Sequence, residues 1–280
     1  MKLLKYFSIL ILFMLFLASC TEKININLDD SYTRLVVDGA ITSDTAVHKV
    51  ILSTTTSFYY NQAAPGVTGA LVTINDGFQT ITLHESNESP GTYLTDSNTF
   101  GIEGRIYSLQ IDLPAPINGF SQYKASCELK PVAKLDSIGL HYLDTWEFWE
   151  IQCYALDPPA KNFYLFKNYV NGKLVSDTIS ELIVTDDRMF NGNYTNGVAA
   201  GYLSMKKEDE AIKSGDTVKL QISGITEEYA RFIWSVQTES GYKNPLFSGP
   251  PANVKGNISN GAVGFFTAYS ANYATVVAKY

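Results

Sequence analysis

Short segments of alternating apolar and polar residues recur along most of this chain, and this pattern constrains the fold most strongly. A period of two, as in Ala70–Ile74, places every second side chain on one face of a β-strand. The Asp76-Gly77 step follows that segment and predicts a tight β-hairpin, and Asn171-Gly172 predicts a second one. The 18 Tyr and 15 Phe against only 4 Met also favour strands over helices.

Turn residues divide the pattern into many short strands. In the first half we expect strands at 34–41, 48–54, 70–74, 78–83, 91–93, 106–111 and 123–129. About seven short strands in roughly 100 residues are typical of a β-sandwich. In the second half we expect strands at 137–143, 147–155, 163–170, 178–184, 200–205 and 217–222, and a final pair that ends at Tyr280. Pro131 marks the predicted boundary, which gives a β-sandwich domain at 34–131 and a β-rich domain at 132–280.

One amphipathic helix is expected at 226–240, in the second domain. Thr226 is a favourable N-cap, and Glu227 and Glu228 suit the positive end of the helix dipole. Gly241 ends the segment. Its apolar residues are spaced at i, i+3, i+4 and i+7 and form one face: Tyr229, Phe232, Ile233 and Val236. The sequence therefore predicts a mainly β protein with a single helix that packs on a sheet.

The first twenty residues have the pattern of a bacterial export signal. Lys2 and Lys5 precede an apolar run at 7–17, which is shorter than the ~20 residues that a membrane-spanning helix needs. The run ends at Ala18-Ser19-Cys20, which looks like a lipobox, with residues 1–19 removed and Cys20 acylated. Residues 20–33 would then be a tether. A secretory signal with a chance cysteine is the alternative.

The charge of the chain argues against nucleic acid as a partner. Removal of residues 1–19 takes two of the 21 basic residues and none of the 28 acids, so the net charge falls from −7 to −9. A nucleic-acid-binding surface needs an excess of Lys and Arg, and so does electrostatic binding to an anionic membrane. The lipid on Cys20 is therefore the expected link to the membrane.

The sequence shows no motif for catalysis, for a metal or for a cofactor. His48, His84 and His141 are far apart and match no zinc-ligand spacing, and no Gly-x-Ser-x-Gly element is present. We therefore predict that the protein is not an enzyme.

Exposed aromatic residues are the better candidates for a ligand site. Tyr59 and Tyr60 fall in a predicted loop, and Trp146 and Trp149 flank an acidic residue. Aromatic side chains beside acids or amides can hold a sugar or a peptide. Packing in the core is the alternative for these four residues.

Two cysteines remain in the processed chain, Cys127 and Cys153. Both fall on the apolar side of a strand-like alternation. In an oxidising compartment the two could form a disulfide. Buried free thiols are the alternative, because free cysteine is among the most buried residue types.

Several motifs together resemble one protein family. The motifs are the lipobox, Leu35–Ile41, Val50–Ser53, Gly69–Ile74, Gly91-Thr92-Tyr93, Asn244-Pro245, Pro250–Val254, Gly256–Gly261 and Gly264-Phe265-Phe266. The chain resembles the DUF4249 lipoproteins of Bacteroidetes over nearly its whole mature length. Residues 34–131 are also similar to the carboxypeptidase-regulatory or transthyretin-like sandwich, a fold of the immunoglobulin-like class.

The resemblance implies a lipoprotein of the outer membrane, held at its periplasmic or its surface face. Family members are often encoded beside TonB-dependent receptors, which implies a non-enzymatic accessory role in nutrient uptake. The family has no established catalytic residues, so it assigns none here. A carbohydrate-binding or peptide-binding surface lipoprotein is the alternative, and a hydrolase is a third hypothesis.

Overall fold

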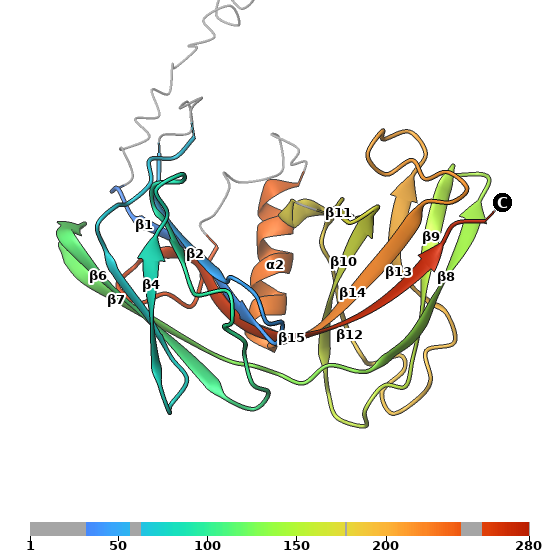
Figure 1. Ribbon diagram of the computed structural model, residues 1–280, viewed down its shortest axis with the longest axis horizontal. Helices are drawn as coiled ribbons and strands as arrows, with labels where there is room; N and C mark the ends of the chain where they lie inside the picture. The colour runs from blue at the N-terminus through green and yellow to red at the C-terminus, as the bar shows by residue number, and fades with distance from the viewer. Residues whose placement is uncertain (1–31, 57–62, 177, 242–253, 280) are drawn as a thin grey trace, which may run out of the picture. The chain divides into compact units, whose positions relative to one another are not determined.

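The computed structural model describes residues 32–56, 63–176, 178–241 and 254–279. Residues from Thr33 onward form one compact unit, which is mainly β, with a large mixed sheet, a small sheet and one α-helix among the described residues. The large sheet has twelve strands in the order β11-β10-β14-β15-β1-β2-β5-β4-β3-β6-β7, with β12 paired to β10. The small sheet has three strands in the order β13-β9-β8. Figure 1 shows both sheets.

The elements have the following bounds. Those of the first half are β1 (Leu35–Thr42), β2 (Lys49–Thr54), β3 (Leu71–Asn75), β4 (Thr80–Glu85), β5 (Thr92–Leu94), β6 (Ile106–Ile117) and β7 (Phe120–Glu128). Those of the second half are β8 (Leu135–Leu143), β9 (Phe148–Ala155), β10 (Phe163–Val170), β11 (Lys173–Leu174), η1 (Ile179–Glu181), β12 (Ile183–Asp186), β13 (Val198–Ser204), β14 (Thr217–Ile225), α2 (Glu227–Ser240) and β15 (Val263–Val277).

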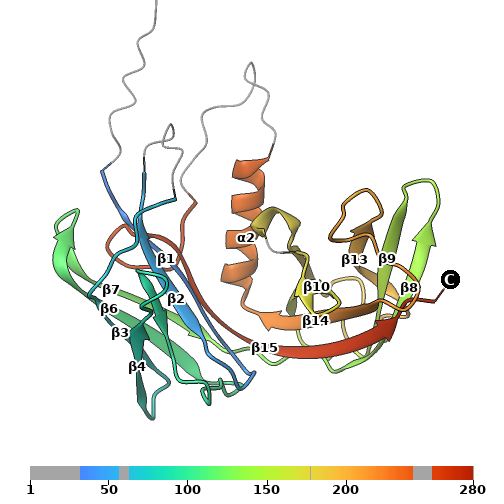
Figure 2. The same cartoon turned by 45° about the horizontal axis from the view of Figure 1, so that its top comes forward.

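Strand β15 joins the two groups of strands. Its first part pairs in parallel with β1, from Val36 opposite Val263 to Thr42 opposite Tyr269. Its second part pairs antiparallel with β14, from Gly224 opposite Ser270 onward. The strand runs continuously through both pairings in both views (Figures 1 and 2). The large sheet is therefore mixed and extends across both halves of the chain.

The buried residues form three hydrophobic clusters. One lies among β1 to β7 and part of β15, and includes Tyr93 and Phe266. A second lies between the small sheet and the strands β10 and β14, and includes Ile151. The third lies under the helix and includes Ile233 and Tyr269. The small sheet thus has one face on the second cluster, which leaves its other face free for solvent.

Helix α2 is held at its N-terminal end and along one side. The Thr226 hydroxyl accepts a hydrogen bond from the Tyr229 backbone N at 3.3 Å, which confirms the predicted N-cap. Ala230 and Ile233 are buried against β10, β12 and β15. The Trp234 indole also donates to the Val184 carbonyl at 3.2 Å.

The structure confirms most of the predicted elements and corrects two. Both hairpins form, and Asn171 and Gly172 take φ values of 49° and 82°, as the predicted turn requires. The strand expected at 178–184 is wrong, because η1 occupies its first part and β12 begins at Ile183. The expected final strand pair is instead the single strand β15. The domain boundary at residue 131 and the sandwich subtype remain predictions.

Candidate functional site

The outer face of the small sheet carries several large side chains. Strand β9 alternates strictly, so that Ile151, Cys153 and Ala155 point into the second cluster. Phe148 and Tyr154 lie on the opposite face and are partly exposed. The same alternation that builds the core thus presents aromatic residues to solvent.

An open hollow of about 390 Å³ lies at the end of this face, and we call it the aromatic hollow. Its lining residues are Leu143, Trp146, Phe148 and Tyr202. Trp146 is 66% exposed and Tyr202 is 47% exposed. Exposed apolar side chains that gather in one concavity, rather than singly, mark sites of interaction.

The turn that carries Trp146 is braced against the end of β13. Glu147 has a φ of 56°, an uncommon conformation for a residue with a side chain. Its carboxylate lies 2.5 Å from the Lys206 ammonium, and its carbonyl accepts from the Met205 backbone N at 3.0 Å. These contacts fix the turn, and with it the position of Trp146 beside Tyr202.

A second pocket of about 350 Å³ adjoins the aromatic hollow, and we call it the polar pocket. Phe148 and Tyr202 line both concavities and so belong to a common wall. Six of the other eight lining residues are polar, among them Asn168 of β10 and Ser176, which follows β11, whereas Val175 and Ile183 are apolar. The polar pocket is thus built from both sheets, since Tyr202 lies on β13 and Asn168 on β10.

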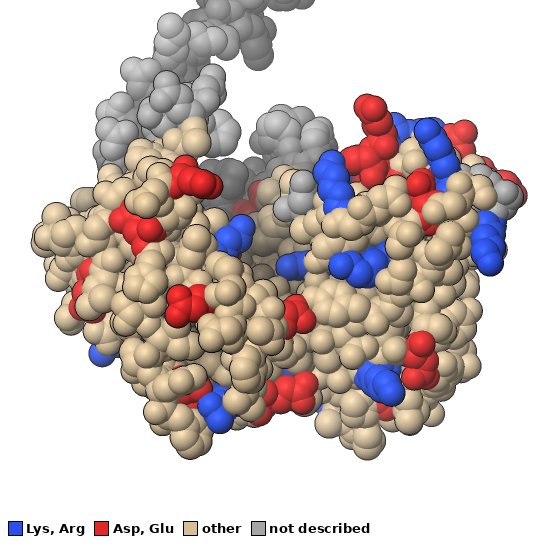
Figure 3. All heavy atoms as spheres, in the orientation of Figure 1, with Lys and Arg blue, Asp and Glu red and all other residues tan. Residues whose placement is uncertain are grey.

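Lys207 links two carboxylates in the polar pocket. Its ammonium lies 2.7 Å from Glu181 and 2.8 Å from Glu210, and these two hydrogen bonds raise the pKa of Lys207. The other Glu210 oxygen accepts from the Ser204 backbone N at 2.7 Å. Two acids against one base leave one net negative charge. Acidic and basic side chains are also interspersed on the face shown in Figure 3.

Asn168 is the residue of the polar pocket with an unmet hydrogen-bonding group. It is 4% exposed, and its backbone N donates to the Ser176 hydroxyl at 3.1 Å. Its side-chain oxygen is buried and has no hydrogen-bond partner among the described residues. A buried acceptor without a donor costs about 1–3 kcal/mol. The Asn168 amide is therefore the strongest indication of a ligand contact in this region.

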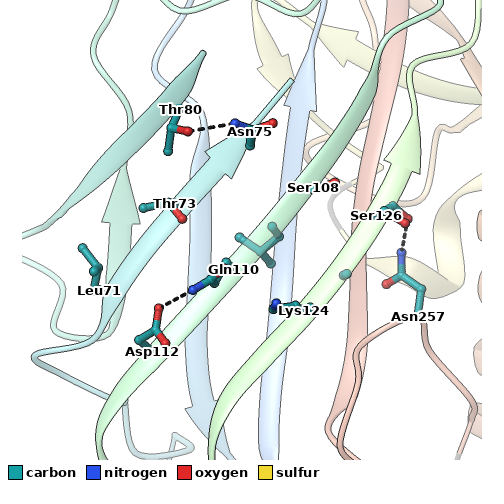
Figure 4. Close-up of a pocket in the computed structure, with 12 residues that line it drawn as sticks. Leu71, Thr73, Asn75, Thr80, Ser108, Gln110, Asp112, Lys124, Ser126 and Asn257 are labelled. Carbon is teal, nitrogen blue, oxygen red and sulfur yellow. Dashed lines mark hydrogen bonds between the residues drawn. The ribbon is translucent and has the colours of Figure 1, made fainter. Parts of the chain in front are cut away.

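A third hollow, of about 750 Å³, lies on the outer face of β3, β6 and β7 (Figure 4). Five of its nine polar side chains bond to other side chains or to the backbone. Asn75 donates to Thr80 at 2.8 Å, and Gln110 donates to Asp112 at 2.8 Å. Asn257 donates to the Phe266 carbonyl at 2.8 Å. Because these groups already have partners, we place the candidate site at the small sheet instead.

The structure separates the residues that the sequence offered as ligand contacts. Trp146 lies in the aromatic hollow. Trp149 instead packs against the second cluster, and its ring lies 5.0 Å from that of Tyr142. Cys20, Tyr59 and Tyr60 lie outside the described residues.

Sequence reasoning missed Tyr202 and Asn168. Tyr202 is exposed on β13, but neither the sequence nor the burial of this strand alternates, so no local pattern marked it. Asn168 interrupts an otherwise largely apolar strand, β10, but the sequence does not show which pocket it lines.

Cys127 and Cys153 are both free and buried. They belong to different hydrophobic clusters, and the Cys127 sulfur lies 3.8 Å from the Ala268 carbonyl oxygen. Burial raises the pKa of Cys153 to about 12. Each cysteine is thus a protonated core thiol in this structure.

The described residues contain no group of three or more His, Cys, Asp or Glu side chains suited to a metal ion. His48 is buried, and its Nε2 lies 3.1 Å from the Thr99 carbonyl, whereas His84 and His141 are exposed. Within the same residues, no helix is long and apolar enough to cross a membrane.

The fold and the site define a mainly β protein with an open, aromatic-walled concavity. Its residues 21–274 match the family described as Domain of unknown function (DUF4249), and the chain belongs to that family. No curated protein matches the chain.

Two solved structures are weakly similar to the chain. One is a DUF4785 family protein from Legionella pneumophila, with 10% identity, a TM-score of 0.27, and coverage of 68% of this chain and 51% of that one. The other is the Yersinia pseudotuberculosis adhesin InvE, with 14% identity, a TM-score of 0.20, and coverage of 69% and 55%. The matched region thus spans about half of each of these longer chains.

Proposed function

We propose that this protein is a lipid-anchored, non-enzymatic accessory of a TonB-dependent nutrient-uptake system in the outer membrane of a Bacteroidetes cell. The lipobox-like end of the export signal at Cys20 supports the anchor. More than one acyl chain gives stable membrane attachment, whereas a single chain holds only marginally. The accessory role follows from the resemblance set out above. In this proposal residues 34–131 form the transthyretin-like sandwich and residues 132–280 form a second domain.

The aromatic hollow is the observation that carries the binding role. A Trp that is 66% exposed beside an exposed Tyr is costly in water unless a partner covers it. Aromatic residues of this kind dominate the binding energy of protein interfaces and of ligand pockets. The receptor, its cargo or both would contact this hollow.

Metabolic labelling with an alkyne-tagged fatty acid tests the anchor. We expect label on the wild-type chain and none on Cys20→Ala, which should also leave the membrane fraction. Cys153→Ala removes a buried core thiol and is the matched control, so it should keep the label. A labelled Cys20→Ala chain would refute acylation at Cys20.

Co-purification from detergent-solubilised outer membranes tests the accessory role. We expect a β-barrel receptor to be recovered with the wild-type protein. Trp146→Ala should reduce this recovery if the receptor binds at the aromatic hollow, whereas Phe120→Ala changes an exposed aromatic residue on β7 and should not. If no β-barrel receptor is recovered with the wild type, the transporter role is wrong.

A surface lipoprotein that binds a carbohydrate or a peptide is the second candidate. The observation in its favour is the polar pocket beside the aromatic hollow, because small-molecule sites combine apolar walls with a few convergent polar groups. A glycan array and a peptide array, probed with the same protein, separate these two ligand classes.

A further inference from the structure

The two concavities at the small sheet adjoin, which suits a ligand made of linked units. The polar pocket holds about 350 Å³ and the aromatic hollow about 390 Å³. Ligand sites range from about 300 to 1,000 Å³, so each concavity suits one small ring rather than an extended ligand. Phe148 and Tyr202 line both, so a chain of two or three rings can pass from one to the other along them.

The hydrogen-bonding groups in the polar pocket favour a hydroxylated ring. Within the described part of the chain, the buried Asn168 oxygen lacks a donor, and an O–H group of a ligand supplies one. Ser176 already accepts from the Asn168 backbone N, which leaves its own hydroxyl proton to donate to a ligand oxygen. A hydroxyl group both donates and accepts, so a polyol satisfies both residues at once.

The charges in the polar pocket favour a neutral ligand. An anion would meet two carboxylates, Glu181 and Glu210, and the single Lys207 is already bonded to both. A cationic ligand would have to displace Lys207 from the same carboxylates, whose contacts are 2.7 and 2.8 Å. A neutral ligand avoids both costs.

From these observations we propose that the polar pocket and the aromatic hollow together bind a neutral oligosaccharide. One ring hydrogen-bonds to Asn168 and Ser176 in the polar pocket. The next ring lies in the aromatic hollow, with its apolar face on Trp146 and Tyr202. This assignment rests on the proposed binding role and specifies the chemical class of its ligand.

The test uses the full-length chain purified in detergent. A glycan array of neutral, acidic and amino oligosaccharides, and a peptide array, are followed by calorimetric titration with the neutral trisaccharide that binds best. We expect a neutral glycan to bind, and both Trp146→Ala and Asn168→Ala to weaken the affinity about tenfold. Trp146 is exposed, so its variant keeps the fold even if Asn168→Ala destabilises it. Phe120→Ala on β7 is the matched aromatic control and should bind like the wild type.

Three outcomes would overturn the assignment. They are the absence of binding to any neutral glycan, a preference for acidic glycans, amino sugars or peptides, and equal affinity of the wild type and Trp146→Ala. The co-purification experiment tests the accessory role separately from the assignment of an oligosaccharide ligand. A protein that recovers its receptor but binds no glycan disproves only the ligand class.

Discussion

At the scale of single residues, Asn168 depends on the absence of a side chain at position 201. A Cβ atom on Gly201 would lie 2.5 Å from both the oxygen and the nitrogen of the Asn168 amide, closer than real contacts allow. We predict that Gly201→Ala lowers the free energy of unfolding by about 1–3 kcal/mol, because the buried amide has to move. Urea denaturation measures this change.

Gly139→Ala provides the control for that substitution. Gly139 lies in β8 of the same small sheet, where a Cβ would meet Tyr154 at an ordinary 3.4 Å. Alanine there should be neutral or slightly stabilising, since it restricts the unfolded chain. Equal effects of the two substitutions would show that Gly201 is not needed for the position of Asn168.

His48 should make the stability of the fold depend on pH. Burial lowers the pKa of His48, whose Nδ1 accepts from the Thr42 backbone N at 3.4 Å. A depressed pKa means that the folded state favours the neutral ring. The stabilisation is therefore complete above the unfolded-state pKa of 6.5 and is lost as the pH falls through the lower folded-state pKa. We expect the unfolding free energy to fall as the pH drops below the unfolded-state value of 6.5.

The variant His48→Gln isolates this dependence. It should be less stable at pH 7 by about 1–3 kcal/mol, because buried hydrogen bonds are lost. Its unfolding free energy should also lack the dependence on pH that His48 contributes. His84→Gln changes an exposed histidine and should keep the slope of the wild type. An unchanged slope in His48→Gln would assign the effect to other groups.

The two tryptophans show how far the sequence could predict the site. Alternation along 149–155 already places Trp149 on the side of Ile151 and Cys153, and the structure confirms that this side is buried. Trp146 precedes the strand, so its exposure depends on the turn and on the contact between Glu147 and Lys206. That contact joins residues about 60 positions apart, which no local pattern reveals.

At the scale of single elements, the N-cap of α2 was predictable and can be tested. We predict that Thr226→Ala costs about 1 kcal/mol, because the hydroxyl no longer accepts from the Tyr229 backbone N. Thermal unfolding followed by circular dichroism measures the loss. Thr226→Ser keeps the hydroxyl and should retain most of the stability. Equal losses in both variants would point to packing of the Thr226 methyl group instead.

The hairpins and α2 were predictable because their signals are local. The Asp76-Gly77 and Asn171-Gly172 steps each encode a turn within a few residues. The place of β15 was not predictable, because its partner β1 lies more than 200 residues earlier in the chain. Gly264 allows this pairing, since its φ is 95° and a Cβ would lie 2.0 Å from the Val37 carbonyl oxygen. The need for glycine at position 264 is therefore visible only once the pairing of β1 with β15 is known.

At the scale of the whole molecule, β15 should couple the two large hydrophobic clusters. Phe266 is fully buried in the cluster formed mainly by β1 to β7, and it lies on the same strand that pairs with β14. We predict that Phe266→Ala lowers the stability of both halves together, by about 3–5 kcal/mol, in one cooperative transition. Because β15 pairs with both β1 and β14, loss of its pairing with β1 should also weaken the strands that pack around β14.

The positions of the tryptophans make this coupling measurable. The three tryptophans all lie after residue 131, at positions 146, 149 and 234, so their fluorescence reports on the second half alone. Far-ultraviolet circular dichroism instead reports on every strand. Coupling requires that Phe266→Ala shift both denaturation curves to the same new midpoint. Ile151→Ala, in the other cluster, should shift both curves in the same way. If Phe266→Ala instead moves the dichroism curve and leaves the fluorescence curve in place, the halves unfold separately, as the predicted boundary at residue 131 would allow.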